Sequence, residues 1–568
     1  MSQSHRPRVV LPLCLLFIAA CGDSGGADGG MDEIGTDPTL GSTGTTDSET
    51  DSTGTTSTTD TTSTTTDTTS TSSTTSDSSD GGTKFDMAPL SDADVPPPPP
   101  SCKVIDDMNA VGQCRESAPP DSFEPDTQWS YTGPAGFDQA IATPLVVNLT
   151  DDDQNGEIDL CDIPDVILVA GPKAGDTRPS KMLAIDGETG TVHFEFAGLV
   201  QYAATPALGD IDNDGLPEII SVESGSNGRL LAFEHDGPLK WTSNTNWTAA
   251  QSSAIAIADV DADGDVEIIA GARLYDHNGI ELWAKPDIIY SASAAADLDN
   301  DGDLEILTSG TVYHHDGSVY FTVPGITGQG GLASHPQVAD VDEDGLPEVL
   351  YAVNDGLWLL QHDGTVTWSS FRPTGEASDW DRPVNIHDLD GDGMPEFGAS
   401  APSHYGVWEF DKSTVWSAPI GDPSGQAGGT AFDFLGAGVA QTVYADENLL
   451  HVFDDTGFEL LSTPRKSGTV LEYPVVADID NDGSAEILVV SNTLFGGNLP
   501  YTLTAIRDAE DRWIQGRRIW NQHTYHVTNV REDGTIPQHE PPHWESLNTF
   551  RTQAQIEGGG LCLPDPQG

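Results

Sequence analysis

A nine-residue acidic motif recurs along the sequence and limits what this chain can fold into. The copy from Asp210 to Glu218 reads DIDNDGLPE, with carboxylates at positions one, three, five and nine and Gly215 at position six. Carboxylates at this spacing can turn toward one point, as a hard cation such as Ca²⁺ requires when it gathers its roughly six to eight oxygen ligands. The glycine permits the sharp turn, because its backbone adopts dihedral angles that are costly for other residues.

Five further copies follow the same pattern, and a longer loop that resembles an EF-hand loop precedes them all. We therefore expect about six or seven Ca²⁺ ions, held mainly for structural stability. The predicted ligands are Asp151, Asp153, Asn155 and Asp159 in the long loop, where Asp162 is the twelfth residue; then Asp210, Asp212, Asp214 and Glu218; Asp259, Asp261, Asp263 and Glu267; Asp297, Asp299, Asp301 and Glu305; Asp340, Asp342, Asp344 and Glu348; Asp388, Asp390, Asp392 and Glu396; and Asp478, Asp480, Asp482 and Glu486.

The spacing of the copies indicates a regular structural repeat. The first aspartates of the six short motifs are 49, 38, 43, 48 and 90 residues apart, so the last interval holds two periods. The sequence DFLGAGVAQ, which begins at Asp433, lies at the midpoint of that interval and has Leu435, Ala437 and Gln441 where the other copies have acids. We interpret this copy as a repeat that keeps its fold and has lost its ion.

The segments around each motif predict strands. Short apolar, β-branched runs such as SAIAIA and EIIAG flank the motif, and neither is long or periodic enough for a helix. A third strand then leads through an Asp-Gly or Asn-Gly turn to a fourth strand that often carries tryptophan. The sequence thus predicts an all-β protein, a β-propeller of about eight four-stranded blades, with seven possible if the first period is only a cap.

The pattern resembles the FG-GAP or VCBS repeats that build the propeller of integrin α subunits, over roughly residues 140–510. The resemblance implies that the acidic loop joins the first two strands of a blade and that a backbone carbonyl at position seven adds to the ligands. The Phe-Gly and Gly-Ala-Pro signatures of that family are mostly missing, which leaves the subfamily open. The sequence TQWSYTG (127–133) resembles the tryptophan strands, so we expect it to complete the last blade and close the ring.

The N-terminal region has the features of an exported protein. Residues 1–20 have a basic start and an apolar run, as in a signal peptide, and the sequence around Cys21 resembles the bacterial lipobox. That resemblance implies lipidation of Cys21 and an outer-membrane lipoprotein, at the cell surface or in the periplasm. Residues 21–100 are rich in Thr, Ser, Asp and Pro and are predicted to form a disordered stalk. We assign residues 101–530 to the propeller and 531–568 to a C-terminal tail packed on or near it.

Cysteine and histidine use adds two further predictions. Four cysteines remain after the signal and the lipidation site, which indicates two disulfides with three possible connectivities. The simplest pairing joins Cys102 to Cys114 and leaves Cys161 with Cys562. The histidines of the tail are interpreted as packing and hydrogen-bonding residues rather than a transition-metal site; they are His523, His526, His539 and His543.

The net charge and the motifs limit the classes of function that this protein can have. The formal net charge is −68, with 23 Lys and Arg against 91 Asp and Glu, so no basic surface for nucleic acid is expected. No catalytic motif has the context it needs. We favour a non-enzymatic, calcium-stabilised binding or adhesion module for an extracellular protein or glycan. The first alternative is a calcium-dependent polysaccharide lyase. A more remote alternative is a quinone-dependent dehydrogenase, because the sequence AIDGETGTV (184–192) resembles the blade turns of that family.

Overall fold

The computed structural model describes residues 102–104, 108, 112–173, 178–225, 227–248, 250, 253–286, 292–323, 325–326, 334–373, 382–423, 427–494, 496–498 and 501–564. The chain divides into a unit of residues 1–90 and a unit of residues 91–568, and every described residue lies in the second. The predicted signal peptide, Cys21 and the predicted stalk lie outside the described residues. In the described part, no helix has both the length and the apolar character needed to cross a membrane.

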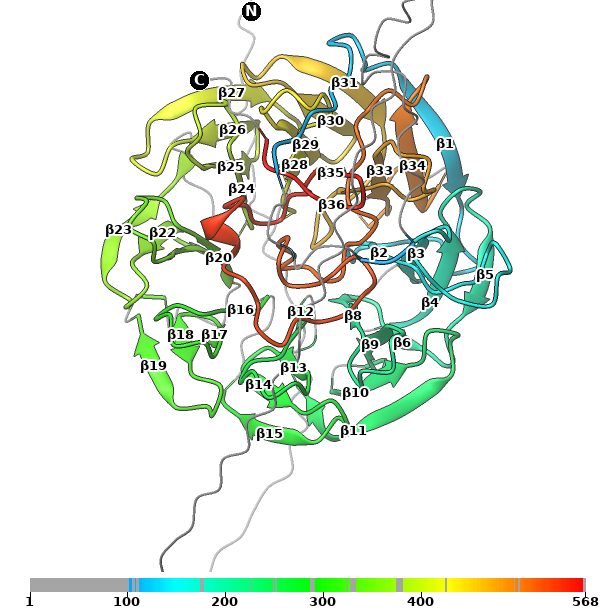
Figure 1. Ribbon diagram of the computed structural model, residues 1–568, viewed down its shortest axis with the longest axis vertical. Helices are drawn as coiled ribbons and strands as arrows, with labels where there is room; N and C mark the ends of the chain where they lie inside the picture. Colours follow the sequence, from blue (N-terminus) through cyan, green and yellow to red (C-terminus); the bar gives the residue numbers. More distant parts are fainter. Residues whose placement is uncertain are drawn as a thin grey trace, which may run out of the picture. The chain divides into compact units, whose positions relative to one another are not determined.

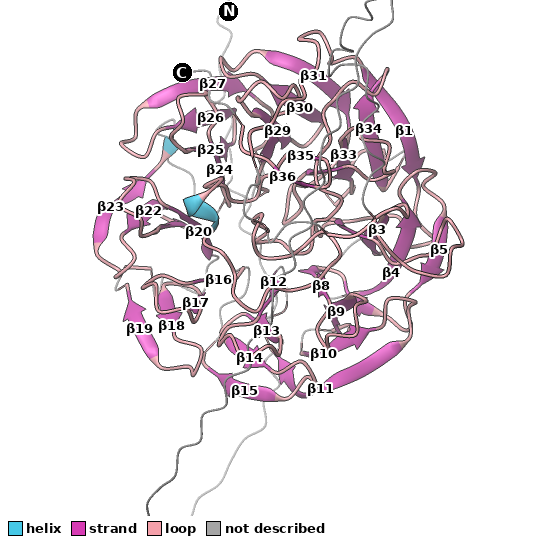
Figure 2. Cartoon of the chain, viewed as in Figure 1, coloured by secondary structure: helices cyan, strands magenta, loops and turns pink. Residues whose placement is uncertain are grey.

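Eight antiparallel sheets, numbered here as blades 1 to 8, form a ring around a common axis (Figure 1). Strands and loops make up nearly all of the described residues (Figure 2). From the inner to the outer strand, the first four blades are β2 (Leu145–Val147), β3 (Asp165–Ala170), β4 (Pro179–Asp186) and β5 (Val192–Glu195); β8 (Ala207–Gly209), β9 (Glu218–Val222), β10 (Gly228–Phe233) and β11 (Leu239–Trp247); β12 (Ser253–Ala258), β13 (Glu267–Ala270), β14 (Arg273–Tyr275) and β15 (Glu281–Ala284); and β16 (Ala294–Ala296), β17 (Glu305–Leu307), β18 (Thr311–Tyr313) and β19 (Val319–Thr322).

Blades 5 to 8 continue the ring. They are β20 (Ser334–Ala339), β21 (Glu348–Val353), β22 (Gly356–Leu360) and β23 (Val366–Phe371); β24 (Asn385–His387), β25 (Glu396–Ala401), β26 (His404–Trp408) and β27 (Thr414–Pro419); β28 (Thr430–Phe432), β29 (Gln441–Ala445), β30 (Leu449–Phe453) and β31 (Glu459–Pro464); and β32 (Val475–Ala477), β33 (Glu486–Val490), β34 (Leu503–Asp508) and β1 (Pro125–Tyr131). The short strands β6 (Val200–Gln201) and β7 (Ala204–Thr205) pair with β4 and β12.

The last blade is built from both ends of the propeller sequence. Strand β1 pairs antiparallel with β34, with Tyr131 opposite Leu503 and Pro125 opposite Asp508. This pairing confirms the predicted ring closure and fixes the count at eight blades rather than seven. The repeat at Asp433 also forms a complete blade, β28 to β31, so its fold is kept as predicted. Strand β1 thereby covers the edge of β34, which would otherwise be exposed.

Aromatic residues of several outer strands connect one blade to the next. The indole N–H groups of Trp241 and Trp283 donate hydrogen bonds to the carbonyl oxygens of His277 and His315, at 2.9 and 2.8 Å. These acceptors lie in the Asn-Gly and Asp-Gly turns of the following blades, and each indole ring lies against the turn glycine. The recurrent tryptophan and the recurrent turn therefore form one inter-blade contact.

We expect Gly317→Ala to destabilise the propeller by about 1–3 kcal/mol. Gly317 has φ +79°, and a Cβ atom there would lie 2.9 Å from the Trp283 ring, so the substitution adds both backbone strain and a steric clash. Gly198→Ala is the matched control, because its φ is +94° and no atom lies within 4 Å. Urea unfolding measures both variants; equal losses of stability would contradict the inter-blade contact.

The segment after β34 follows the axis of the ring, where Figure 1 draws it in orange to red across the centre. Inner strands have one edge without a neighbouring strand, and buried N–H and C=O groups there need partners. The segment reaches all eight blades with hydrogen bonds at or beside their inner strands: Trp520 with Val146, Asn521 with Leu208, Gln522 with Ile257, Thr524 with Ser293, Arg551 with Pro336, Phe550 with Ile386, and Gln553 with both Ala431 and Val476. It contains the 3₁₀ turn η3 (His543–Glu545) and the hairpin β35 (Ile556–Glu557) and β36 (Gly560–Leu561).

The disulfides differ from the simplest pairing expected from the sequence. Cys102 is bonded to Cys161, and Cys114 is bonded to Cys562. The reason for the second pairing is the path of the chain, because the segment that precedes β1 runs parallel to the end of the axial segment. The amide of Cys114 donates to the carbonyl of Leu563 at 2.9 Å, which places Cys114 beside Cys562, 448 positions further along the chain.

Candidate metal centres

The six short acidic motifs lie in the loops between the first and second strands of their blades, as the repeat pattern predicts. Each loop is closed by the same hydrogen bonds, shown here for blade 5. The amide of Gly345 donates to Asp340 Oδ2 at 3.0 Å, and the amide of Val341 donates to Glu348 Oε2 at 2.8 Å. The amide of Leu346 donates to Asp344 Oδ1 at 2.9 Å. Each of these carboxylates thus uses one oxygen to shape the loop.

The backbone turns twice through the left-handed region inside each loop. The residue at position four has a positive φ, for example 58° at Glu343, and the glycine at position six has φ near 90°, for example 88° at Gly345. A side chain at position six would be strained, which explains why every copy has glycine there.

Several carboxylate oxygens at positions one and nine are buried without a hydrogen-bond partner. In blades 5, 6 and 8 these atoms are Asp340 Oδ1, Glu348 Oε1, Glu396 Oε1, Asp478 Oδ1 and Glu486 Oε1. A buried acceptor without a partner costs free energy, so such atoms require an explanation. In blade 6, single ligand atoms of Asp388, Asp390, Asp392 and Glu396 lie within 4.8 Å of one another. This all-oxygen donor set fits a hard divalent cation such as Ca²⁺.

Burial raises the pKa of the glutamate at position nine. The pKa is about 8 for Glu267, about 8 for Glu348 and about 9 for Glu396, first because these side chains are removed from water and then because the loop aspartates repel their charge. The fold therefore holds carboxylates that resist ionisation at neutral pH unless a positive charge lies beside them.

We expect the metal-free protein to lose stability as the pH rises from about 6.5 to about 9. A glutamate with a raised pKa in the folded state stabilises the protein while it is protonated, and this stabilisation is lost as the pH passes through the folded-state values of about 8 and 9. The buried histidines His335 and His387 have lowered pKa values of about 3 and about 4, so they are already neutral in this window.

The measurement is the free energy of unfolding in EDTA across this pH range. The same series in millimolar CaCl₂ is the control, where the fall should be much smaller because the ion favours the charged carboxylates. A metal-free protein that gains stability toward pH 9 would contradict the assignment of these glutamates.

The comparisons with known proteins agree with this repeat architecture. A family model described as FG-GAP-like repeat matches residues 210–270, 297–351 and 340–399. The chain contains FG-GAP-like repeats. No curated protein sequence gives a significant match.

Solved structures extend the likeness to the fold around the FG-GAP-like repeats. The Vibrio cholerae biofilm matrix protein Bap1 aligns with a TM-score of 0.65 and 19% identity, over 78% of this chain and 100% of that chain. The rhamnogalacturonan lyase YesW aligns with a TM-score of 0.47 and 15% identity, over 78% and 84%. The Bacillus licheniformis rhamnogalacturonan lyase PL11 aligns with a TM-score of 0.46 and 16% identity, over 80% and 83%. At 19% identity the likeness to Bap1 shows a shared fold alone.

In blade 1 the long acidic loop is an insertion in the first hairpin. Val147 pairs with Asp165, as Gly209 pairs with Glu218 in the FG-GAP-like repeat of blade 2, so Asp165 occupies the structural position nine. Asp165 Oδ2 accepts the amide of Leu149 at 3.2 Å. The motif spacing alone does not reveal Asp165, whereas the strand register does.

Inside the insertion, Asp151, Asp153 and Asp162 place ligand atoms within 4.8 Å of one another. Asp162 also accepts backbone hydrogen bonds from Asp152, Asp153 and Asp159, at 2.9 to 3.1 Å. The Asp159 side chain accepts the amide of Cys161 at 2.9 Å, and Asn155 bonds to Asp153 at 3.0 Å. The carboxylate of the twelfth residue, Asp162, therefore lies beside those of the first and third residues, Asp151 and Asp153.

Blade 7 closes its loop without the missing acids. The amides of Ala437 and Gly438 donate to Asp433, at 3.0 and 2.6 Å. Gln441 Oε1 accepts the amide of Phe434 at 2.9 Å, as the glutamate does in other blades, and its Nε2 donates to the carbonyl of Val439 at 2.7 Å. An amide at position nine thus satisfies both of its polar atoms within the loop.

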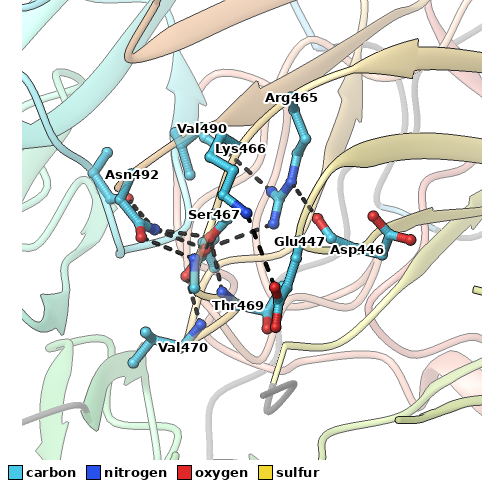
Figure 3. Close-up of polar contacts among 12 residues, drawn as sticks. Asp446, Glu447, Arg465, Lys466, Ser467, Thr469, Val470, Val490 and Asn492 are labelled. Atoms are coloured by element: carbon cyan, nitrogen blue, oxygen red, sulfur yellow. Dashed lines mark hydrogen bonds and ion pairs between the residues drawn. The ribbon is translucent and has the colours of Figure 1, made fainter. Parts of the chain in front are cut away.

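A second polar cluster lies between blades 7 and 8 (Figure 3). Arg465 donates to the carbonyl of Asp446 at 2.8 Å and to that of Val490 at 3.1 Å, and Asn492 donates to Ser467 at 2.8 Å. Nearby, Tyr444 and Thr469 donate to Asp422, whose pKa burial raises to about 6. Arg465, Glu472 and Asp422 are all less than 10% exposed. Arg465 connects blades 7 and 8 through these two backbone carbonyls, so we interpret the cluster as structural.

The axial segment buries three of the four histidines singled out in the sequence. His526 is bonded to Glu540, at 2.5 Å, and its ring lies 4.9 Å from that of His543. His523 lies 5.9 Å from His335, and burial and the charge of Arg551 both lower its pKa. A guanidinium beside these rings disfavours a metal cation there, which supports their interpretation as packing residues. His539 is exposed.

Proposed function

We propose that this protein is a calcium-stabilised, non-enzymatic binding or adhesion module that works outside the cytoplasm. The observation that carries the proposal is the set of buried, unpartnered carboxylate oxygens at positions one and nine of the loops. Ca²⁺ bound there would supply positive charge and cross-link the first hairpin of a blade. In blade 5, Asp340 and Glu348 each use one oxygen to accept a loop amide, and their second oxygens are buried without a partner and so are free to bind the ion.

Binding at an outer surface is favoured over catalysis at the axis. The axial segment occupies the centre of the ring and bonds to every blade. The charged cluster of Arg465, Glu472 and Asp422 is buried, and Arg465 is committed to backbone carbonyls. A polysaccharide lyase needs a base and a cation that its substrate can reach. A fold of this kind also serves Bap1, described as a biofilm matrix protein.

The location and partner follow from the same proposal. Two disulfides fit an oxidising compartment. A lipid on Cys21 would hold the protein at the outer membrane, at the cell surface or in the periplasm. We propose an extracellular protein or glycan as the partner, and the net charge of −68 argues against nucleic acid.

The test is a binding screen of the purified ectodomain against glycans and extracellular-matrix proteins, with and without EDTA. We expect a ligand whose binding is lost in EDTA and restored by CaCl₂. In parallel, the protein is incubated with uronate polysaccharides and monitored for the absorbance of unsaturated products. Product formation at a catalytic rate would overturn the non-enzymatic proposal in favour of the lyase.

A further inference from the structure

A lysine contacts the acidic loop of blade 2, Asp210 to Glu218, although this loop has the complete motif. Lys240, in the outer strand β11, places its ammonium group against that loop. Nζ lies 2.6 Å from Asp212 Oδ2, 2.9 Å from Glu218 Oε1 and 3.1 Å from Glu234 Oε2. Asp212 and Glu218 are positions three and nine of the motif, so the ammonium contacts two of the predicted calcium ligands.

We infer that Lys240 takes the place of the metal ion in blade 2, so that this loop folds without Ca²⁺ and binds it weakly or not at all. The inference rests on the proposed role of Ca²⁺ in the other blades. An ammonium group has three N–H donors, and here each has a carboxylate acceptor. The side chain is 17% exposed, so water screens these contacts only partly.

The other blades support this interpretation. Glu Oε1 at position nine is buried without a partner in blades 5, 6 and 8, at Glu348, Glu396 and Glu486. In blade 2 the equivalent atom, Glu218 Oε1, is the one that accepts from Lys240. The lysine therefore satisfies the oxygen that has no partner in blades 5, 6 and 8, and in blade 4 His314 Nδ1 lies 3.0 Å from the same oxygen of Glu305.

A β-bulge explains how residue 240 reaches the loop. In blade 2, Ala232 pairs with Trp241 and Phe233 pairs with Leu239, which leaves Lys240 as the extra residue of the outer strand. All eight outer strands have this register shift, and the extra residues are Gln128, His193, Lys240, Leu282, Tyr320, Thr367, Val415 and Leu460.

Two further bulge residues contact acids of their own blades. His193 Nδ1 lies 2.9 Å from Asp165 Oδ1, at position nine of blade 1, and Gln128 Nε2 donates to Asp480 Oδ2 at 2.6 Å in blade 8. Lys240 is the lysine of the series, whereas the apolar Leu282 and Val415 bring no charge. The cation that contacts the acidic loop of blade 2 is therefore supplied by the bulge residue of that blade.

Blade 6 provides the matched reverse test. Its bulge residue is Val415, and Asp390, Glu396 and Glu409 correspond to the three acids around Lys240. Glu409 begins its turn with a hydrogen bond to Ser413 O at 3.0 Å, as Glu234 does with Pro238 O at 2.9 Å. The variant Val415→Lys should therefore recreate the contacts of Lys240 in a blade with an unpartnered glutamate oxygen.

The experiment measures bound Ca²⁺ per chain by calcium titration calorimetry and by elemental analysis after gel filtration. We expect Lys240→Leu to bind one more Ca²⁺ than the wild type and Val415→Lys to bind one fewer. The double variant should bind the wild-type number. The chelator-induced drop in Tm should increase in the first variant and decrease in the second. Lys181→Leu is the control, because Lys181 contacts Glu195 and the Phe137 ring, neither of which is a predicted Ca²⁺ ligand, and the substitution should leave the number unchanged.

The outcomes separate this inference from the proposed function. A wild type that binds no Ca²⁺ would overturn both. A wild type that binds Ca²⁺, with Lys240→Leu and Val415→Lys unchanged in number, would overturn the role of Lys240 alone. If Lys240→Leu does not fold without Ca²⁺, as the inference allows, Lys240→Met and the independent Val415→Lys variant still decide it.

Discussion

Removal of Ca²⁺ with excess EDTA is expected to lower the Tm of the ectodomain by about 10 °C or more. Each ion held at about 100 times its Kd contributes roughly 2.7 kcal/mol to the folded state, and the loops of several blades contribute together. Without the ion, unpartnered carboxylate oxygens such as Glu396 Oε1 and Asp478 Oδ1 remain buried beside other acids. Thermal melts monitored by circular dichroism in EDTA, after CaCl₂ is restored, and in MgCl₂ measure the effect. A Tm that EDTA does not change would contradict the whole assignment.

Glu396→Gln is the site-specific control for this prediction. Blade 7 shows how glutamine serves at position nine, because Gln441 Oε1 accepts the amide of Phe434 and its Nε2 donates to Val439 O. The variant should bind one fewer ion and reduce the EDTA-induced drop in Tm, while its metal-free form is more stable than the metal-free wild type. Equal metal-free stabilities would indicate that the buried carboxyl group of Glu396 is not the source of the effect.

Features encoded by local spacing were predictable from the sequence. The acidic loops, the strands on either side and a count of about eight blades follow from a motif of nine residues that recurs every 38 to 49 residues, with one double interval of 90. The pairing of β1 with β34 was also predictable, because the sequence around Trp129 repeats the pattern of other outer strands. The path of the axial segment and the pairing of Cys114 with Cys562 were not, since nothing in sequence separation reports that residues 448 apart are in contact.

The candidate site shows the same division. The ligands at positions one to nine are read from the loop, but Asp165 and Lys240 become visible only through strand register. Asp165 is separated from the blade 1 loop by an insertion, and Lys240 reaches its loop because a β-bulge turns it there. The nine-residue motif makes the blade 2 loop look equal to the others. The positive charge beside its carboxylates comes from Lys240, which is 22 positions beyond Glu218.

The axial segment is expected to be essential for the stability of the ring, and Arg551 tests this. Its fully buried guanidinium donates to the carbonyls of His523, Val384 and Pro336, at 3.2, 3.1 and 3.5 Å, and so joins the segment to blades 5 and 6. Arg551→Ala leaves a cavity and removes the donor from these buried carbonyls, so we expect a loss of about 3–5 kcal/mol in the free energy of unfolding.

Arg229→Ala is the matched control, because Arg229 is exposed and pairs with Glu223 at the surface, and we expect a change within about 0.5 kcal/mol. Both variants are compared by urea unfolding in saturating CaCl₂, which keeps the metal contribution constant. If Arg551→Ala were as stable as Arg229→Ala, the blades would hold the ring without the axial segment. The eight hydrogen-bonded contacts along the axis would then be a consequence of ring closure rather than a cause of it.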